Sequence, residues 1–280
     1  MSNAVPSPSI TGFAGINLAC GGKLCHEAGW VNADHSPSAS DVISIDLLKP
    51  LPFAEGSFDV VYHSQFIEHL PQDWAVSFMK ECHRILKPRG VLRVVTPDLK
   101  NQAQEYLNNL QRVLESPADE TARLRYEWIR LEMLDQLTRH HSGGEMVSFL
   151  KVSGRQVGGY LWERMGRSGK DLMPSNEASG RGGVKAMLRA ARDRLRAAKV
   201  GVTPMATRVG RFRLSGEAHL CMYDEYLLSS LLEQAGFGQV AKVSAKESRI
   251  PDWNRTHLDC DEQGHPDCEV SLFMEAAKQA

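Results

Sequence analysis

The chain has 280 residues, of which 42% are hydrophobic and 24% charged, and its formal net charge at pH 7 is −1. These proportions are typical of a globular protein whose core is large enough to need neither a metal ion nor disulfides for stability. No eighteen uncharged apolar residues follow one another, so no membrane-spanning helix is predicted.

Short apolar runs and one helical pattern alternate along the first hundred residues, after a flexible lead over residues 1–12. Strands are predicted at Ile16–Cys20, Trp30–Asp34, Phe58–Tyr62 and Gly90–Thr96. Between the last two strands, apolar residues at four-residue spacing indicate a helix over about 70–87, which Pro88 and Gly90 end. This alternation predicts an α/β fold with a doubly wound, mostly parallel sheet covered on both faces.

The second half of the chain is helical before the α/β pattern returns. Helical periodicity covers about 100–140 and 184–199, whereas 151–183 has little periodicity. The later elements are predicted as a helix over Tyr223–Gly236 and strands over Gln239–Ala245 and Glu269–Glu275. We therefore expect one α/β domain formed by 13–115 and 216–280, with 116–215 as a basic, mainly helical insertion.

A glycine turn follows the first predicted strand, and an acid ends the second. Gly21 and Gly22 let the backbone approach a ligand closely, and Asp34 can accept hydrogen bonds from ribose hydroxyls. Asp34 follows Gly21 by thirteen residues, less than the roughly 20 of a dinucleotide fingerprint, and the full G-x-G-x-x-G is missing. The turn alone indicates a nucleotide site of unspecified kind and argues against a nicotinamide-dependent dehydrogenase.

Four ordered motifs narrow this assignment. They are Asn17-Leu-Ala-Cys-Gly-Gly22, Asp46-Leu-Leu-Lys-Pro-Leu-Pro-Phe53, Ile67-Glu-His-Leu70 and Leu86-Lys-Pro-Arg-Gly-Val-Leu-Arg93. In this order they resemble class I S-adenosylmethionine-dependent methyltransferases of the type 11 group, in particular a bacterial branch associated with glycan biosynthesis. The resemblance covers about residues 14–100 and resumes near 217–278, and it implies a Rossmann-like methyltransferase fold with S-adenosylmethionine as cofactor.

The resemblance also implies roles for individual residues in cofactor binding. Asp34 is expected to hold the ribose diol, Asp46 with Leu47 to reach the adenine edge, and Ser64 to lie near the methionine moiety. The residues expected to line the methionine and ribose are Asn17, Ala19, Cys20, Gly21 and Gly22. This chain departs from the family at Asn17, where an acid is usual, and at Ala19, where the first glycine of the turn is usual.

Glu68 and His69 are the candidate catalytic residues, because they follow the third predicted strand, where the acceptor should arrive. A hydroxyl acceptor benefits from a general base, most often a histidine. The structural alternative is that one of them caps the next helix or pairs with Arg84. His140, His141 and His219 are weaker candidates.

The stretch from Lys151 to Ser215 holds fifteen Lys and Arg against four Asp and Glu. It is compatible with a solvated helical face, with an anionic membrane surface bound through 184–199, or with a phosphate-bearing acceptor. Nucleic acid is disfavoured, because aromatic side chains are not interleaved with the arginines. The expected acceptor is a small molecule or a glycan, methylated on oxygen.

Several alternatives remain open from the sequence. Backbone N–H groups of Ser142–Gly144 could receive an anionic substrate group. His257, Cys260, His265 and Cys268 could be drawn as a zinc site, although we expect no metal. The chain could also bind the cofactor or its product without turnover, or serve as a membrane-surface adaptor. Scattered cysteines and no secretory pattern favour the cytoplasm, with attachment to the inner membrane as the alternative.

Overall fold

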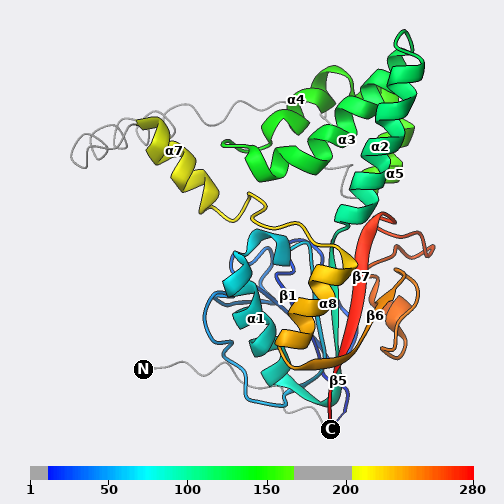
Figure 1. The fold of residues 1–280 in the computed structure, drawn as a ribbon. Helices are drawn as coiled ribbons and strands as arrows, with labels where there is room; N and C mark the ends of the chain where they lie inside the picture. The colour runs from blue at the N-terminus through cyan, green and yellow to red at the C-terminus, as the bar shows by residue number, and fades with distance from the viewer. Residues whose placement is uncertain (1–11, 167–203) are drawn as a thin grey trace. The chain divides into compact units, whose positions relative to one another are not determined.

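The computed structural model describes residues 12–166 and 204–280. They divide into two compact units (Figure 1). The α/β unit contains the described residues up to Asn101, then Glu163–Gly166 and Leu220–Ala280. The helical unit contains Gln102–Trp162 and residues 204–219. No helix in the described residues is both long and apolar enough to cross a bilayer.

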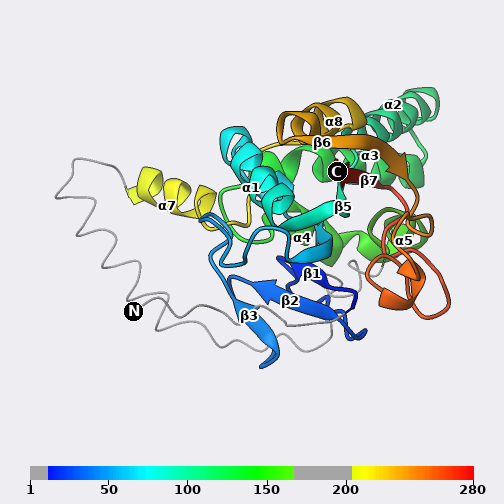
Figure 2. The same cartoon turned by 90° about the horizontal axis from the view of Figure 1, so that it is seen from below.

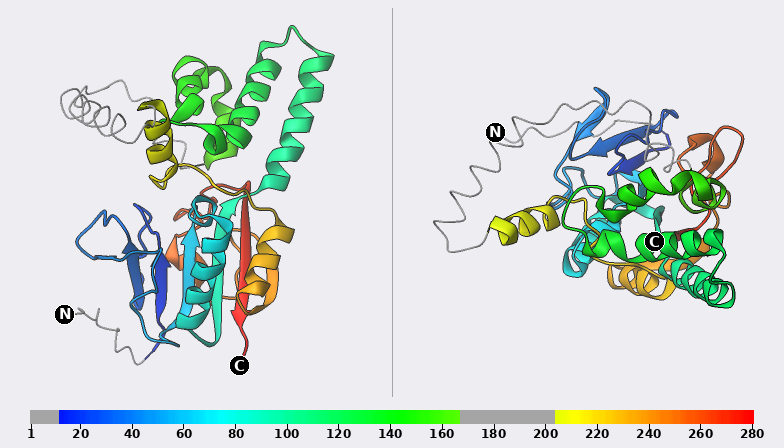
Figure 3. Two further views of the ribbon diagram at one scale, coloured as in Figure 1. Left: turned by 60° about the vertical axis from the view of Figure 1, so that its left-hand side comes forward. Right: turned by 90° about the horizontal axis from the view of Figure 1, so that it is seen from above.

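The α/β unit is built on a seven-stranded sheet in the order β3-β2-β1-β4-β5-β7-β6, as Figure 3 shows from the blue strands at one edge to the red β7 near the other. The strands are β1 (Gly15–Leu18), β2 (Trp30–Asp34), β3 (Val42–Ser44), β4 (Phe58–Ser64), β5 (Leu86–Pro97), β6 (Phe237–Val243) and β7 (Ser271–Lys278). The pairs among β1 to β5 are parallel, and β7 runs antiparallel to both of its neighbours. The predicted mostly parallel α/β sheet is confirmed.

One face of the sheet is covered by α1 (Gln72–Ile85) and α8 (Glu225–Gln234), which contact each other (Figure 2). Their apolar residues join the inward side chains of the strands in the larger core cluster. Helix α1 ends one residue before Leu86, whose backbone is extended. Lys87, the residue before Pro88, is disfavoured in the helical region, so the helix has to end at or before it.

The opposite face is covered by residues 244–270 rather than by long helices. The segment contains one short 3-10 helix, η4 (Trp253–Thr256), and contributes Ile250, Leu258 and Cys260 to a second core cluster. Both faces are therefore covered, as predicted, but only one of them by α-helices in the described residues.

The sequence prediction missed strand β3 and misplaced the start of strand β5. Strand β3 was not predicted, because three residues are too few to show a period. Strand β5 begins at Leu86 instead of Gly90 and continues through the Lys87–Gly90 segment, where its register with β4 shifts between Phe58 and Val60. The proline and glycine thus produce an irregularity within the strand.

The helical unit contains α3 (Glu120–Thr138), α4 (Gly144–Val152), η2 (Gly154–Val157) and α7 (Pro204–Arg213), and most of α2 (Leu99–Glu115) and α5 (Gly158–Met165). The first residues of α2 and the last residues of α5 belong to the α/β unit. Trp128 is fully buried in α3 and packs on Phe149 of α4. The units divide at Asn101/Gln102 and His219/Leu220, whereas the sequence places these junctions at 115/116 and 215/216. The ring of Tyr106 in α2 lies 5.8 Å from the ring of Tyr126 in α3, so this part of α2 packs within the helical unit. The predicted helix 184–199 lies outside the described residues.

Candidate cofactor and active site

The predicted cofactor residues lie along one edge of the sheet, at the carboxyl ends of its parallel strands. The turn Ala19–Gly22 follows β1, Asp34 ends β2, Asp46 follows β3 and Ser64 ends β4. The chain goes from β1 to β2 on one side of the sheet and to β4 on the other, so the strand order reverses between β1 and β4. Ligands of open α/β sheets bind at such a switch point.

The turn after β1 leaves its glycine backbone accessible. Its Lys23 N–H donates to the Cys20 carbonyl at 2.8 Å, and both Ala19 (φ 52°) and Gly21 (φ 53°) are left-handed. A Cβ placed on Gly21 or on Gly22 would meet no atom within 4 Å. A ligand can therefore approach this backbone closely.

Asp34 stands beside the turn and fixes it. One carboxylate oxygen accepts the Gly21 N–H at 2.9 Å, and the other accepts the Ser36 N–H at 2.7 Å. An ionised carboxylate offers about four acceptor positions, so Asp34 keeps acceptor capacity for ligand hydroxyls.

Asn17 supports the turn from beneath. The residue is 1% exposed, and its side-chain amide nitrogen donates to the Lys23 carbonyl at 2.7 Å and to Asn32 Oδ1 at 3.0 Å. Asn32, directly opposite on β2, also accepts the Cys25 N–H and donates to the Cys25 carbonyl. Both N–H groups of the Asn17 side chain are thus used within the protein. The role of Asn32 was missed in the sequence, since it depends on the register of β1 and β2.

The side chains of Cys20, Asp46 and Leu47 have less capacity to bind a ligand than their positions suggest. Burial, followed by the charge of Asp34, raises the pKa of the Cys20 thiol to about 11, which keeps it protonated. A hydrogen bond from Lys49 lowers the pKa of Asp46, whose carboxylate lies 2.9 Å from the Lys49 Nζ. The Leu47 side chain lies in the core, so only its backbone could reach a ligand.

Glu68 and His69 lie in the 3-10 helix η1 (Ile67–His69), just beyond β4. Glu68 is fully buried, and one carboxyl oxygen accepts the Thr96 hydroxyl at 3.1 Å. The other has no hydrogen-bond partner in the described part of the chain. Burial raises the pKa of Glu68 to about 7. A carboxyl oxygen of Glu68 and a ring nitrogen of His69 lie within 4.8 Å of each other.

The two structural alternatives proposed for Glu68 and His69 are wrong. Arg84 instead binds Glu81 at 2.7 Å and the carbonyls of Leu51 and Phe53. The residue preceding α1 is Pro71, and no side chain caps that helix end. Glu68 instead binds the segment that re-enters the α/β unit at Leu220, because its backbone carbonyl accepts the N–H groups of Leu220 and Cys221.

Thr96 and Tyr223 were not predicted as part of this site. Thr96 is fully buried near the end of β5, and Tyr223 follows the returning chain and bridges to Asp98. Burial is the largest cause that raises the pKa of Tyr223, and the charge of Glu68 contributes. No local sequence pattern signals either residue, because Thr96 meets Glu68 across the neighbouring strands β4 and β5, and Tyr223 comes from a distant part of the sequence.

Comparisons with known proteins agree with this geometry. Residues 25–94 match a family model described as a methyltransferase domain, a range that contains Asp34, Asp46, Ser64, Glu68 and His69. A curated protein of Mycolicibacterium smegmatis described as a probable S-adenosylmethionine-dependent methyltransferase is 46% identical over 52 residues, which are 18% of this chain. The match spans only 19% of that relative. Over these residues the α/β unit is similar to S-adenosylmethionine-dependent methyltransferases.

Solved structures are similar to this chain only at low sequence identity and low TM-score. An S-adenosylmethionine-dependent methyltransferase from Mesorhizobium loti is 15% identical with a TM-score of 0.38, over 97% of this chain and 93% of that one. One from Archaeoglobus fulgidus is 11% identical with a TM-score of 0.39, over 95% and 86% of the two chains.

S-adenosylmethionine is the cofactor named for the relative that this chain matches, and the described residues fit it. The accessible backbone at Gly21 and Gly22 has room for the ligand, and Asp34 retains acceptor positions. Asn17 does not supply the negative charge that is usual at its position. The remaining contacts expected at Ala19, Cys20, Asp46, Leu47 and Ser64 stay predictions.

The structure does not support the two other sites considered from the sequence, the anion site at Ser142–Gly144 and the zinc site. In the Ser142–Gly144 turn, the Gly143 N–H donates to the Glu217 carboxylate at 2.9 Å and the Gly144 N–H donates to the His141 carbonyl at 3.3 Å, so both groups already have acceptors within this chain. Over residues 12–166 and 204–280, His257, Cys260, His265 and Cys268 do not gather as metal ligands. Instead, Cys268 Sγ donates to the Arg164 carbonyl, and a ring nitrogen of His265 lies 3.3 Å from Asp261.

Proposed function

We propose that this chain transfers a methyl group from S-adenosylmethionine to an acceptor that enters at the carboxyl edge of the sheet. The observation that carries the proposal is the turn after β1, with its accessible glycine backbone and the adjoining Asp34 carboxylate at the switch point. When bound, S-adenosylmethionine supplies an electrophilic methyl group on a sulfonium. Much of the acceleration of such a displacement comes from positioning the reacting atoms.

The acceptor atom in this proposal is a hydroxyl oxygen, and His69 with Glu68 handles its proton. With S-adenosylmethionine bound as the methyl donor, the His69 ring would accept the hydroxyl proton of the acceptor as its oxygen is methylated. Glu68, whose carboxyl lies within 4.8 Å of that ring, carries a negative charge above about pH 7 and then stabilises the protonated imidazole. The rate is therefore expected to rise with pH through neutrality.

A saccharide, free or lipid-linked, is the proposed acceptor class. The support is the resemblance of the motifs between Asn17 and Arg93 to a bacterial branch associated with glycan biosynthesis. Fold alone does not determine a substrate, so activity must be tested on sugars directly.

Calorimetric titration with S-adenosylmethionine and S-adenosylhomocysteine tests the cofactor site. The wild type should bind at micromolar concentrations, and Asp34→Ala should weaken binding about 10- to 100-fold, the value of one charge-assisted hydrogen bond or more. Asp73→Ala, in the exposed first turn of α1, serves as the control and should bind normally. Wild-type protein that binds neither compound would contradict the proposal.

A second candidate function is cofactor binding without turnover. Asn17, which has no charge and uses both side-chain N–H groups internally, favours it. Methyl transfer from radiolabelled S-adenosylmethionine to a panel of sugars separates the two functions, since a pure binding protein would leave every sugar unlabelled. The adaptor hypothesis depends on residues 184–199, outside the described part of the chain.

A further inference from the structure

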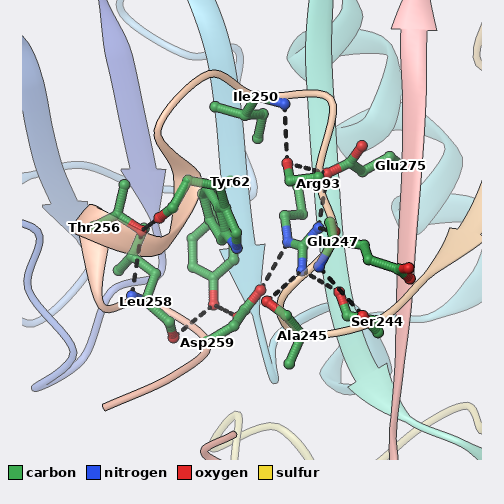
Figure 4. A network of polar contacts seen from close by, with 12 residues as sticks. Tyr62, Arg93, Ser244, Ala245, Glu247, Ile250, Thr256, Leu258, Asp259 and Glu275 are labelled. Atoms are coloured by element: carbon green, nitrogen blue, oxygen red, sulfur yellow. Dashed lines mark hydrogen bonds and ion pairs between the residues drawn. The ribbon is translucent and has the colours of Figure 1, made fainter. Parts of the chain in front are cut away.

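Arg93 anchors the segment 244–270 to the centre of the sheet. Its guanidinium is fully buried, and it lies 2.7 Å from Asp259 and 2.7 Å from Glu275 (Figure 4). Its remaining N–H groups donate to the carbonyls of Ser244, Ala245 and Glu247. All five donors of this side chain are therefore satisfied.

Asp259 is held from a second side as well. Its other carboxyl oxygen accepts the Tyr62 hydroxyl at 2.7 Å, as Figure 4 shows. Trp253 packs over both partners, with the Arg93 guanidinium 4.6 Å from its ring and the Tyr62 ring 5.3 Å away. The position of Asp259 relative to β4 and β5 is thus closely determined.

From Asp259, contacts lead directly to the cofactor turn. The Asp259 carbonyl accepts the Asp267 N–H at 2.8 Å, and the Asp267 carboxylate lies 2.9 Å from the Lys23 Nζ. The side chains of Lys23 and Asp267 are 34% and 13% exposed, so solvent screens this ion pair only in part. Cys25, at the end of the turn, packs in the same core cluster as Trp253 and Leu258.

We infer that the Lys23–Asp267 ion pair is a positioning contact for cofactor binding, an inference that rests on the proposed function. Lys23 lies one residue beyond the two accessible glycines, and its carbonyl is the one that Asn17 holds. The pair therefore joins the turn to a segment that Arg93 anchors. Because a preorganised loop loses less conformational entropy when a ligand binds, this contact raises the affinity without touching the ligand.

Charge variants measure the effect in the full chain. Asp267→Asn and Lys23→Met should each weaken S-adenosylhomocysteine binding about 2- to 5-fold, the range of one ion pair that solvent partly screens. The KM for S-adenosylmethionine should rise while kcat at saturating cofactor stays unchanged. The charge-swapped double variant Lys23→Asp/Asp267→Lys should recover most of the affinity. Lys87→Met removes the Lys87–Asp59 ion pair, whose lysine is as exposed as Lys23 (35% against 34%), and should bind as the wild type does.

Hydrogen exchange of the free protein provides a measurement that needs no ligand. In Asp267→Asn the amides of Lys23 and Cys25, which donate within the turn and to Asn32, should exchange faster than in the wild type. Unchanged affinity in Asp267→Asn, or an equal loss in Lys87→Met, would overturn the inference. If the wild type binds no S-adenosylhomocysteine, the proposed function fails, and unchanged exchange in Asp267→Asn then overturns the positioning role independently.

Discussion

At the scale of single residues, Glu68 combines complete burial with a sparse set of partners. Within the described residues, the Thr96 hydroxyl donates to its carboxyl, and burial raises the pKa of that carboxyl to about 7 from an ordinary 4.5. The folded protein therefore binds this proton more tightly than the unfolded chain does. Relative to acid, this carboxyl lowers the stability of the fold as pH rises from about 4.5 to about 7.

Glu68→Gln should remove this pH dependence while keeping the bond from Thr96. The free energy of unfolding of the variant relative to the wild type should increase between pH 4.5 and pH 7.5 by at most about 3 kcal/mol. Urea unfolding of both proteins at several pH values measures the difference. A difference that stays constant with pH would show that Glu68 titrates normally.

At the scale of elements, the turn after β1 uses one left-handed alanine and one left-handed glycine. Ala19 has φ 52° and Gly21 has φ 53°, a region where a Cβ is strained. Replacing the alanine by glycine at one position, and the glycine by alanine at the other, should therefore change the stability of the protein in opposite directions.

Ala19→Gly should stabilise the protein by about 0.5–1 kcal/mol, because relief of about 1–2 kcal/mol of backbone strain exceeds the added entropy of the unfolded chain. Gly21→Ala should destabilise it by about 1 kcal/mol through strain alone, since its Cβ would meet no atom within 4 Å. Urea denaturation of the two variants checks both signs. Equal shifts in one direction would refute the conformational explanation.

At the scale of the whole α/β unit, one buried cation joins the sheet to residues 244–270. Arg93 binds the carboxylates of Asp259 and Glu275, and both of these are almost fully buried. Removing one partner from such a cluster leaves uncompensated charge, which costs far more than the intact cluster contributes.

Arg93→Met should lower the free energy of unfolding by about 3–5 kcal/mol. The triple variant Arg93→Met/Asp259→Asn/Glu275→Gln should be more stable than the single variant, because no buried charge remains unpaired. Chemical denaturation measures both. A loss below about 1 kcal/mol in Arg93→Met would mean that the segment is held mainly by its apolar contacts.

The sequence by itself determined those parts of this protein that local patterns encode. Strand β2 matched its prediction at both ends, and β1, β4, α1 and α8 were found with small shifts, because apolar periodicity and turn residues are local properties. The ordered motifs and the acid at the end of β2 also predicted the turn, Asp34 and the neighbourhood of Glu68 as parts of the site.

The tertiary structure alone decided which distant residues meet. Asn17 faces Asn32 because β1 and β2 pair in one register, and Glu68 meets Thr96 because β4 and β5 are neighbours. Lys23 and Asp267 lie near opposite ends of the sequence and come together because residues 244–270 fold back over the sheet. A period or motif carries no information about such contacts, since they depend on strand order and on how the whole chain closes its core.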